Sequence, residues 1–204
     1  MADHGIDISH WNAVDDWQAV HGDDIVFCSH KVTEGVDHVD AQAAQKIPAA
    51  RDAGIAVGGY HFARPGDVAA QVDHFTRLLT ENDLLTDGSF VPMLDVEAAE
   101  LRDGADAFVG DFVNRFRKAA GVGRIAVYSN LDWYQHVLKP DGWADDEVFC
   151  WVARFNGDPG NPGWSHSRLA LHQHTDRGSV AGIPGGVDRN VTLDGFGVGD
   201  LTLG

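Results

Sequence analysis

Two acidic residues, Asp95 and Glu97, stand one residue apart at the end of an apolar run that begins near residue 90. If this run is a strand, side chains two positions apart leave the same face, so both carboxyl groups would enter one pocket. Like charges at such a range push two pKa values apart, which lets one acid stay protonated while the other is ionised. A pair of carboxyl groups in different protonation states is what the enzymatic hydrolysis of a glycosidic bond commonly uses.

The same spacing has a simpler interpretation. An Asp-x-Glu sequence after a strand can be a solvated strand end, or the start of a helix in which early acids favour the helix dipole. Perturbed acid pairs are enriched at active sites without being unique to them. The remainder of the chain therefore has to distinguish the two interpretations.

Length and composition limit the class of protein. The chain has 204 residues, 44% hydrophobic, which suits one domain spanning residues 1–204 with a real core. The formal net charge of −16 argues against nucleic acid and against an anionic membrane surface as partners. No segment approaches 18 consecutive apolar residues, so we expect no membrane insertion.

The N-terminus and the two cysteines bear on where the protein is made and on whether it holds a disulfide or a structural zinc ion. Residues 1–4 lack the basic and apolar regions of a signal peptide, so we expect cytoplasmic synthesis without a leader. Cys28 and Cys150 lie in apolar runs, where a free cysteine behaves as a small buried hydrophobe, although a disulfide stays open. Neither has the spacing of a structural zinc site. We expect no metal, no cofactor and a monomer.

Short apolar runs alternate with longer amphipathic ones along most of the chain. Helical periodicity is present over residues 39–53, 68–79, 105–119 and 131–137. Strands are predicted at residues 5–8, 25–31, 56–62, 90–96, 124–128, 148–153, 169–174 and 186–191. Five strand-helix units followed by three strands predict an α/β fold with a parallel sheet wound right-handed, and eight strands suffice to close it into a barrel.

Polar residues end these apolar runs, and the chemistry of such barrels sits at the carboxyl ends of the strands. The mouth is predicted to carry Asp7, Ser9, His10, Lys31, Thr33, Glu34, Tyr60, His61, Phe62, Asp95, Glu97, Tyr128, Ser129, Asn130, Arg154, Asn156, Gln173, His174 and Asp188. Aromatic faces stack on sugar rings, and carboxylates and amides bind hydroxyl and acetamido groups, so the site suits a carbohydrate polymer. No glycine-rich phosphate-binding motif is present.

Several of these residues have two interpretations. His61 is a candidate substrate contact, but its position near a strand end is equally compatible with a core imidazole bonded to a carboxylate. Lys31 is expected to form a structural ion pair with Glu34 or Asp7. Tyr128 could contact a ligand or pack inside the barrel.

The tryptophans supply candidate sugar platforms. Trp11, Trp133 and Trp151 are candidates, and we expect at least one of the six tryptophans to act in this way. Trp17 is interpreted as part of a helix core.

A set of motifs, in this order along the chain, resembles glycoside hydrolase family 25. The motifs are Gly5-Ile6-Asp7-Ile8-Ser9, Lys31-Val32-Thr33-Glu34-Gly35, Ala53-Gly54 with Gly58-Gly59-Tyr60-His61-Phe62, Leu94-Asp95-Val96-Glu97, Trp151-Val152-Ala153-Arg154, Gln173-His174-Thr175 and Gly186-Val187-Asp188. The resemblance implies a single TIM-like, flattened eight-stranded barrel of (β/α)5β3 type. It also implies an N-acetylmuramidase of the phage endolysin or bacterial autolysin kind, cleaving the β-1,4 bond between N-acetylmuramic acid and N-acetylglucosamine.

The resemblance assigns roles by position. Glu97 is similar to the general acid/base of the family and Asp95 to the residue that orients the 2-acetamido group, while Asp7 and Asp188 match the two other acids of the catalytic set. The substrate-binding candidates are Glu34, Tyr60, His61, Tyr128, Arg154 and Gln173. Two positions depart from the family pattern: His30 stands where an apolar residue is commoner, and His174 where tyrosine is usual.

A mechanism follows from these roles. Glu97, desolvated beside an ionised Asp95, should have a raised pKa and protonate the leaving oxygen. The resemblance implies attack on C1 by the acetamido oxygen of the substrate and retention of configuration. Inversion stays open, because the spacing of the two acids does not set the distance between their carboxyl groups.

Two alternatives remain. His61, His172 and His174 with an acid could form a zinc site, giving a wall amidase, although no H-E-x-x-H motif is present. The chain could also be a catalytically inactive barrel that binds cell-wall carbohydrate. The complete acid set favours the hydrolase, with peptidoglycan as partner, acting on the wall after release or export.

Overall fold

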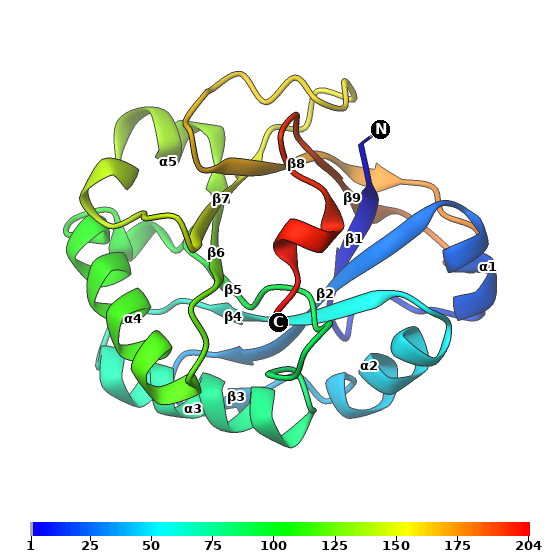
Figure 1. Cartoon of the computed structure of the whole chain (residues 1–204), viewed down its shortest axis with the longest axis horizontal. Helices are drawn as coiled ribbons and strands as arrows, with labels where there is room; N and C mark the ends of the chain where they lie inside the picture. The colour runs from blue at the N-terminus through cyan, green and yellow to red at the C-terminus, as the bar shows by residue number, and fades with distance from the viewer. Residues whose placement is uncertain (1) are drawn as a thin grey trace.

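In the computed structural model, which describes residues 2–204, eight strands close into a barrel (Figure 1). The order around it is β1-β9-β8-β7-β6-β5-β4-β2, with β1 pairing to β2 and the short β3 attached to β2. The strands are β1 (His4–Ile8), β2 (Ile25–Glu34), β3 (His38–Val39), β4 (Ala56–Phe62), β5 (Met93–Asp95), β6 (Ile125–Asn130), β7 (Val148–Ala153), β8 (Leu169–Gly178) and β9 (Val187–Thr192). All eight predicted barrel strands are thereby confirmed.

The sheet is mixed, and the predicted parallel pairing holds for every barrel strand except β9. Strands β1, β2 and β4 to β8 pair in parallel, whereas β9 is antiparallel to both β8 and β1. Residues 179–186 connect β8 to β9, a length that suits a hairpin but is too short for a parallel crossover. The register places Asp7 opposite Asp188 and Gln173 opposite Asn190.

Five α-helices surround the barrel: α1 (Trp17–Gly22), α2 (Ala43–Asp52), α3 (Val68–Glu81), α4 (Ala105–Ala120) and α5 (Leu131–His136). The side chains of Asp16 and Asp67 cap α1 and α3 by accepting hydrogen bonds from first-turn amides. Helix α1 lies outside the predicted helical ranges, although its first residue, Trp17, was interpreted as part of a helix core; Val20 is its one buried residue, so the segment has no apolar stripe of helical period. Helix α2 starts later than predicted, because Val39 pairs with β2 in the β3 hairpin.

Two apolar cores hold the barrel together. The outer core lies between the strands and the helices, and the inner core fills the barrel with side chains that include Phe27, Phe90 and Trp151. Phe27 stacks on Phe90 at 4.6 Å between ring centroids. Gly5 is required beside these rings, because a Cβ there would lie 2.2 Å from the Phe27 ring.

The C-terminal segment closes one end of the barrel. It contains the 3-10 helix η3 (Val198–Leu201), and Thr202 forms a β-bridge with Phe90. Leu201 is fully buried in the inner core. This segment crosses the end of the barrel nearest the viewer in Figure 1. The polar side chains at the carboxyl ends of the parallel strands therefore meet at the other end.

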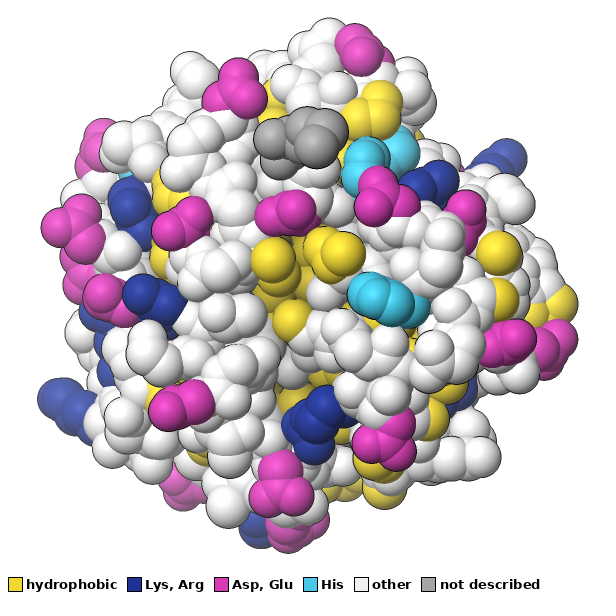
Figure 2. All heavy atoms as spheres, turned by 45° about the vertical axis from the view of Figure 1, so that its right-hand side comes forward, with side chains coloured by type: hydrophobic (Ala, Val, Ile, Leu, Met, Phe, Trp, Pro, Cys, Tyr) yellow, Lys and Arg dark blue, Asp and Glu magenta, His cyan; other side chains and the backbone are white. Residues whose placement is uncertain are grey.

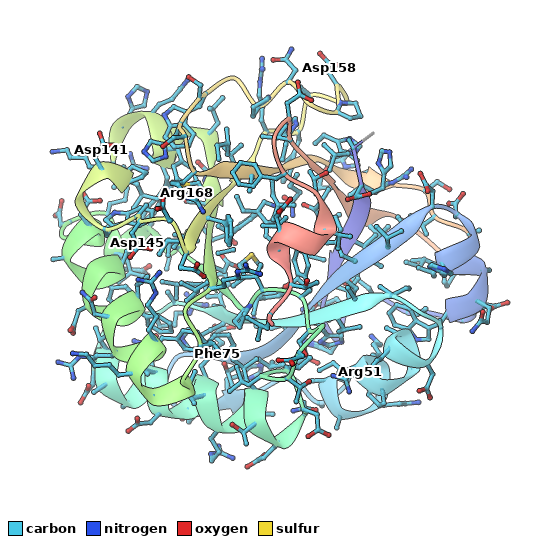
Figure 3. The ribbon with its side chains drawn as sticks, viewed as in Figure 1. Arg51, Phe75, Asp141, Asp145, Asp158 and Arg168 are labelled. Carbon is cyan, nitrogen blue, oxygen red and sulfur yellow. The ribbon has the colours of Figure 1, made fainter. Side chains whose placement is uncertain are left out.

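The barrel wall is covered unevenly. Helices α3 and α4 pack together over one side, where Phe75 lies, while the loop that carries Asp158 projects from the opposite side (Figure 3). Phe75 belongs to a run of ring contacts with Phe112 and Phe116 in the outer core. Cys28 and Cys150 are buried free thiols, as predicted.

The acidic charge is spread over the surface. In Figure 2, Asp and Glu side chains are dispersed among Lys and Arg side chains and form no single acidic patch on the visible face. Among residues 2–204, no helix combines the length and the apolar composition that crossing a bilayer requires.

Candidate active site at the carboxyl end of the barrel

The acid pair after β5 is arranged as its spacing predicts. Asp95 ends the strand and is buried, Val96 is buried in the outer core, and Glu97 follows with an exposed side chain. Because Val96 enters the outer core, the two acids on either side of it face the barrel axis. The charge of Glu97 is the largest charge effect on Asp95, which agrees with two neighbouring carboxyl groups.

Both acids hold protons more tightly than in water. Burial, then the charges of Glu97 and Asp7, raises the pKa of Asp95 well above its usual value. Although Glu97 is open to solvent, burial by the surrounding walls is the largest cause of its raised pKa, followed by the charge of Asp7. The raised pKa of Glu97 matches the prediction.

Burial of Asp95 raises its pKa and so opposes the ionised form that the proposed mechanism expects. Asp95 is the deeper of the two acids, and its Oδ1 atom is buried without a hydrogen-bond partner in residues 2–204. An unpartnered carboxyl oxygen in a site of low polarity favours the neutral acid. The strand ends at Asp95 and not beyond it, so Asp95 stays among the barrel side chains while Glu97 reaches the mouth.

Asp7 on β1 is anchored by two amide side chains. Its Oδ2 atom accepts hydrogen bonds from Nε2 of Gln173 and from Nδ2 of Asn190, both at 2.7 Å. These bonds favour the ionised form, but desolvation is the larger effect and the pKa of Asp7 is raised. All three residues are buried.

Two aromatic side chains fix the orientation of these amides. The hydroxyl of Tyr128 donates to Oε1 of Gln173 at 2.8 Å, and the indole Nε1 of Trp151 donates to Oδ1 of Asn190 at 2.8 Å. An indole nitrogen can only donate, so the Asn190 carbonyl must face it and its NH2 group must face Asp7. Asp7 is therefore held by a directional network that spans β6, β7, β8, β9 and β1.

Asp188 on β9 completes the acid set. It lies opposite Asp7 in the register of the two antiparallel strands and is half-buried. Desolvation, followed by the charges of Asp7, Asp176 and Glu97, raises the pKa of Asp188 to about 8. None of the four acids forms an ion pair within residues 2–204, so no cation in contact offsets the burial that raises each pKa.

Tyr60 and Tyr128 lie close to this acid set. Burial, then the charges of Asp7, Asp95 and Asp188, raises the pKa of Tyr60 well above its usual value. Burial, then the charges of Asp7, Asp95, Glu97 and Asp188, likewise raises the pKa of Tyr128 well above its usual value. The structure thus brings both tyrosines to the acids; contact with substrate stays a prediction for them and for Gln173.

Glu34 stands at the same mouth but has cationic partners. It accepts from Lys31 Nζ at 2.5 Å and from Arg64 at 2.6 and 2.8 Å. Burial would raise the pKa of Glu34, but the hydrogen bonds and charges of these two cations outweigh it and the pKa is lowered. The predicted ion pair of Lys31 with Glu34 is confirmed.

The assignment of His61 as a substrate contact is wrong. The imidazole is fully buried, with Nδ1 at 2.8 Å from Thr33 Oγ1 and Nε2 at 3.1 Å from Gln71 Oε1. It packs against Phe75 and Phe112 beneath α3 and α4, and burial lowers its pKa to about 4. His61 is a core residue, although its partners are a hydroxyl and an amide and not the carboxylate considered above.

Other predicted residues also have structural roles. The Arg154 guanidinium donates to the carbonyl and to Oδ1 of Asn161, both at 3.1 Å, and thereby holds the loop after β7. Trp133 and Trp151 are buried and cannot serve as sugar platforms, whereas Trp11 is 84% exposed.

The zinc alternative lacks a ligand set. Both His61 nitrogens are occupied in the outer core, while His172 and His174 lie on β8 with ring centroids 6.2 Å apart. In the part of the chain that is described, no three His, Cys, Asp or Glu side chains gather in a way that could hold a metal ion.

Sequence reasoning missed Asn190 as a support for Asp7 and misjudged Trp151. A signal for Asn190 was present, because Asp188 and Asn190 have the same one-residue separation as Asp95 and Glu97 and so share a strand face. The role of Trp151 had no such signal, because its partner Asn190 is 39 residues away.

The sequence and the fold match those of a known family. Residues 6–183 match the family described as "Glycosyl hydrolases family 25", and the chain belongs to this family. This match includes Asp7, Asp95 and Glu97 and ends before Asp188.

Curated relatives span nearly the whole chain. The uncharacterized protein YegX of Escherichia coli (strain K12) is 34% identical over 200 residues, covering 92% of this chain and 68% of the relative. Lysozyme M1 of Streptomyces globisporus is 30% identical over 203 residues, covering 91% of this chain and 66% of the relative. The chain thus spans about two thirds of the length of these relatives.

Solved structures share the architecture. The bacterial lysozyme from Streptomyces coelicolor superposes with a TM-score of 0.80 at 25% identity, covering 97% of this chain and 94% of the other. The modular autolysin LytC from Streptococcus pneumoniae, in complex with a synthetic peptidoglycan ligand, gives 0.78 at 20% identity, covering 94% of this chain and 46% of that one. At this lower identity, only the fold is established.

Proposed function

We propose that this chain is a peptidoglycan muramidase that hydrolyses the β-1,4 bond between N-acetylmuramic acid and N-acetylglucosamine. The proposal rests chiefly on one observation: Asp7, Asp95, Glu97 and Asp188 meet at one end of the barrel without a cation in contact, and the pKa of each is raised. Such a cluster disfavours the folded state at neutral pH, so its presence calls for a chemical role. Relatives that are named lysozymes support the proposal that the substrate is peptidoglycan.

Glu97 is suited to be the general acid/base. It is the exposed member of the set, so a glycosidic oxygen can reach it, and its raised pKa keeps a proton available. In the proposed reaction Glu97 protonates the leaving oxygen as the C1–O bond breaks. The same carboxylate later takes a proton from the attacking water, which restores the starting state.

Asp95 is suited to orient the substrate. The Oδ1 atom of its buried carboxyl group has no hydrogen-bond partner among residues 2–204. We infer that the substrate N-H of the 2-acetamido group binds to this carboxyl while the acetamido oxygen forms a bond to C1. Water then opens the cyclic intermediate with net retention of configuration.

Digestion of defined peptidoglycan tests the proposal. The products are reduced with borohydride and analysed by mass spectrometry, which distinguishes a new muramic acid end from a new glucosamine end. A muramidase must produce muramitol-ended fragments. Glucosaminitol ends would identify a glucosaminidase, release of intact peptide stems would identify an amidase, and an unchanged polymer would contradict a hydrolytic function.

A further inference from the structure

One large aromatic side chain near the active site has no role in folding or in the proposed reaction. Trp11 is 84% exposed and lies on the segment that leaves β1 after Ile8. It follows Asp7 by four residues, a distance of at most about 14 Å between Cα atoms even in an extended chain. Trp11 therefore stands near the rim of the candidate active site.

The segment that carries Trp11 is rigidly held. His10, whose ring centroid lies 4.4 Å from that of Trp11, bonds through both its backbone N-H and Nδ1 to Oδ2 of Asp40, each at 2.8 Å. The Lys46 ammonium group donates to the carbonyls of Ser9 and Asn12 at 3.0 and 2.5 Å. A preorganised exposed aromatic side chain loses little entropy when it binds a ligand.

A cavity of about 480 Å³ lies beside Trp11, between this segment and α2. Figure 1 shows α1 and α2 on the same side of the barrel, and residues from both helices line the cavity. Its lining combines two indoles and three amides with one acid, one cation, one histidine and three small aliphatic side chains. They include Trp11, Trp17, Asn12, Gln42, Gln45 and Lys46, and Asp15 is the acid.

We propose that this cavity and Trp11 form a second glycan-binding site, which takes the N-acetylated amino-sugar strand where it extends beyond the four acids. The proposal rests on the proposed function, because it assumes a polymeric glycan substrate. An indole face packs against a sugar ring, and the amides pair with hydroxyl and acetamido groups.

The lining favours a sugar over other occupants. A purely apolar ligand would leave the amide groups of Gln42 and Gln45 and the NH2 group of Asn12 without hydrogen-bond partners, which is costly. A strongly anionic ligand gains little, because the Lys46 charge already binds two carbonyl oxygens and Asp15 lines the same cavity. An uncharged N-acetylated sugar matches both the polar and the aromatic parts.

Kinetics on polymeric peptidoglycan test the site. Trp11→Ala should raise KM for polymeric peptidoglycan about tenfold, the size expected for one lost stacking contact, with kcat nearly unchanged. Trp11→Tyr should restore most of the loss. Phe155→Ala is the matched control, because Phe155 is also an exposed aromatic residue, 56% accessible, but does not line the cavity. An unchanged KM for Trp11→Ala would overturn the proposal.

A second pair of variants keeps Trp11 intact. Ala49→Phe on α2 should fill the cavity and weaken glycan binding, whereas Ala44→Phe, an exposed position of the same helix outside the cavity, should not. Binding is measured by NMR titration of the β-1,4-linked N-acetylglucosamine tetramer in the inactive Glu97→Gln background. Equal affinity for both variants would contradict the site.

The two proposals can fail separately. A chain that lyses peptidoglycan normally with Trp11→Ala would retain the proposed function and lose this site. A chain with no hydrolytic activity would lose the proposed function, while the tetramer titration would still establish or refute glycan binding at Trp11.

Discussion

Acids end two nearby barrel strands, and their surroundings give them opposite properties. Asp95 ends β5 without a hydrogen bond to Oδ1, and its pKa is raised well above its usual value, first by burial and then by Glu97 and Asp7. Glu34 ends β2 between Lys31 and Arg64, which lower its pKa despite the burial that opposes them. A strand-end position therefore brings an acid to the mouth, but the neighbours determine what it can do there.

The difference separates reactive acids from structural ones. An acid without a cation in contact can hold a proton near neutral pH and transfer it, at a cost in stability. An acid bonded to two cations stays ionised and contributes to stability, although solvent screening keeps that contribution small. Substitutions in the two groups should therefore have opposite effects on activity and on unfolding.

The largest effect is expected for Glu97→Gln. Removing the proposed proton donor should lower kcat on peptidoglycan by about 10²- to 10⁴-fold, because general acid catalysis is lost. Release of reducing ends measures the rate. Glu100→Gln, an exposed position three residues later, is the control and should retain wild-type rates. A Glu97→Gln variant with normal turnover would end the assignment of Glu97.

Asp95→Asn should have the next largest effect. The amide keeps the shape of the side chain but cannot provide a carboxylate for the acetamido N-H, so we expect a loss in kcat of about 10²-fold. Steady-state kinetics on peptidoglycan measure it. Thermal melting should show a fold at least as stable as the wild type, because a buried acid with a raised pKa has been removed. Loss of activity together with a large fall in Tm would point to a structural role.

Asp188→Asn should stabilise the protein in a pH-dependent manner. The pKa of Asp188 is raised to about 8 in the folded protein, above its unfolded value of 3.8. Asp188 therefore does not lower the free energy of unfolding of the wild type below pH 4. That free energy falls as the pH rises from about 4 through about 8, because the unfolded chain then loses a proton that the folded protein retains. The variant should melt at the wild-type temperature at pH 4 and several degrees higher at pH 8.5. A Tm difference that does not depend on pH would contradict the raised pKa.

Glu34→Gln should have the smallest effect on stability. It should destabilise the protein, whereas Asp188→Asn should stabilise it. The pKa of Glu34 is lowered, so its contribution is present at neutral pH and lost as pH falls through the folded pKa. We expect a destabilisation of at most about 1 kcal/mol at pH 7 because the pair is partly exposed. Urea unfolding at pH 7 and at pH 3 measures this. A variant more stable than the wild type at pH 7 would remove the contrast between the two groups.

Much of the fold was predictable because its signals are local. The eight barrel strands are short apolar runs, and a run such as residues 148–153 is buried at every position, as a barrel wall requires. Strand β3 was missed because two residues are too short to show a period, and α1 received no predicted range because Val20 is its one buried residue. The direction of β9 depends on the short connection from β8, which periodicity does not report.

The sequence predicted which acids form the candidate site, but not the orientation and the partners of every residue assigned to it. Family resemblance and strand ends identified Asp7, Asp95, Glu97 and Asp188, and the structure brings them together. His61 was misassigned, because a strand-end histidine faces either the mouth or the outer core, and only the packing of α3 and α4 shows which.

By itself, the sequence determined which side chains share a face, because side-chain direction along a strand is a local property with a period of two residues. Depth, partners and proton affinity were decided only by the tertiary structure. Desolvation and charge act through space between residues distant in the chain: Asp7 meets Asn190 across 183 positions, and Glu34 meets Arg64 across 30. Those distant neighbours make one acid a candidate proton donor and another a structural ion.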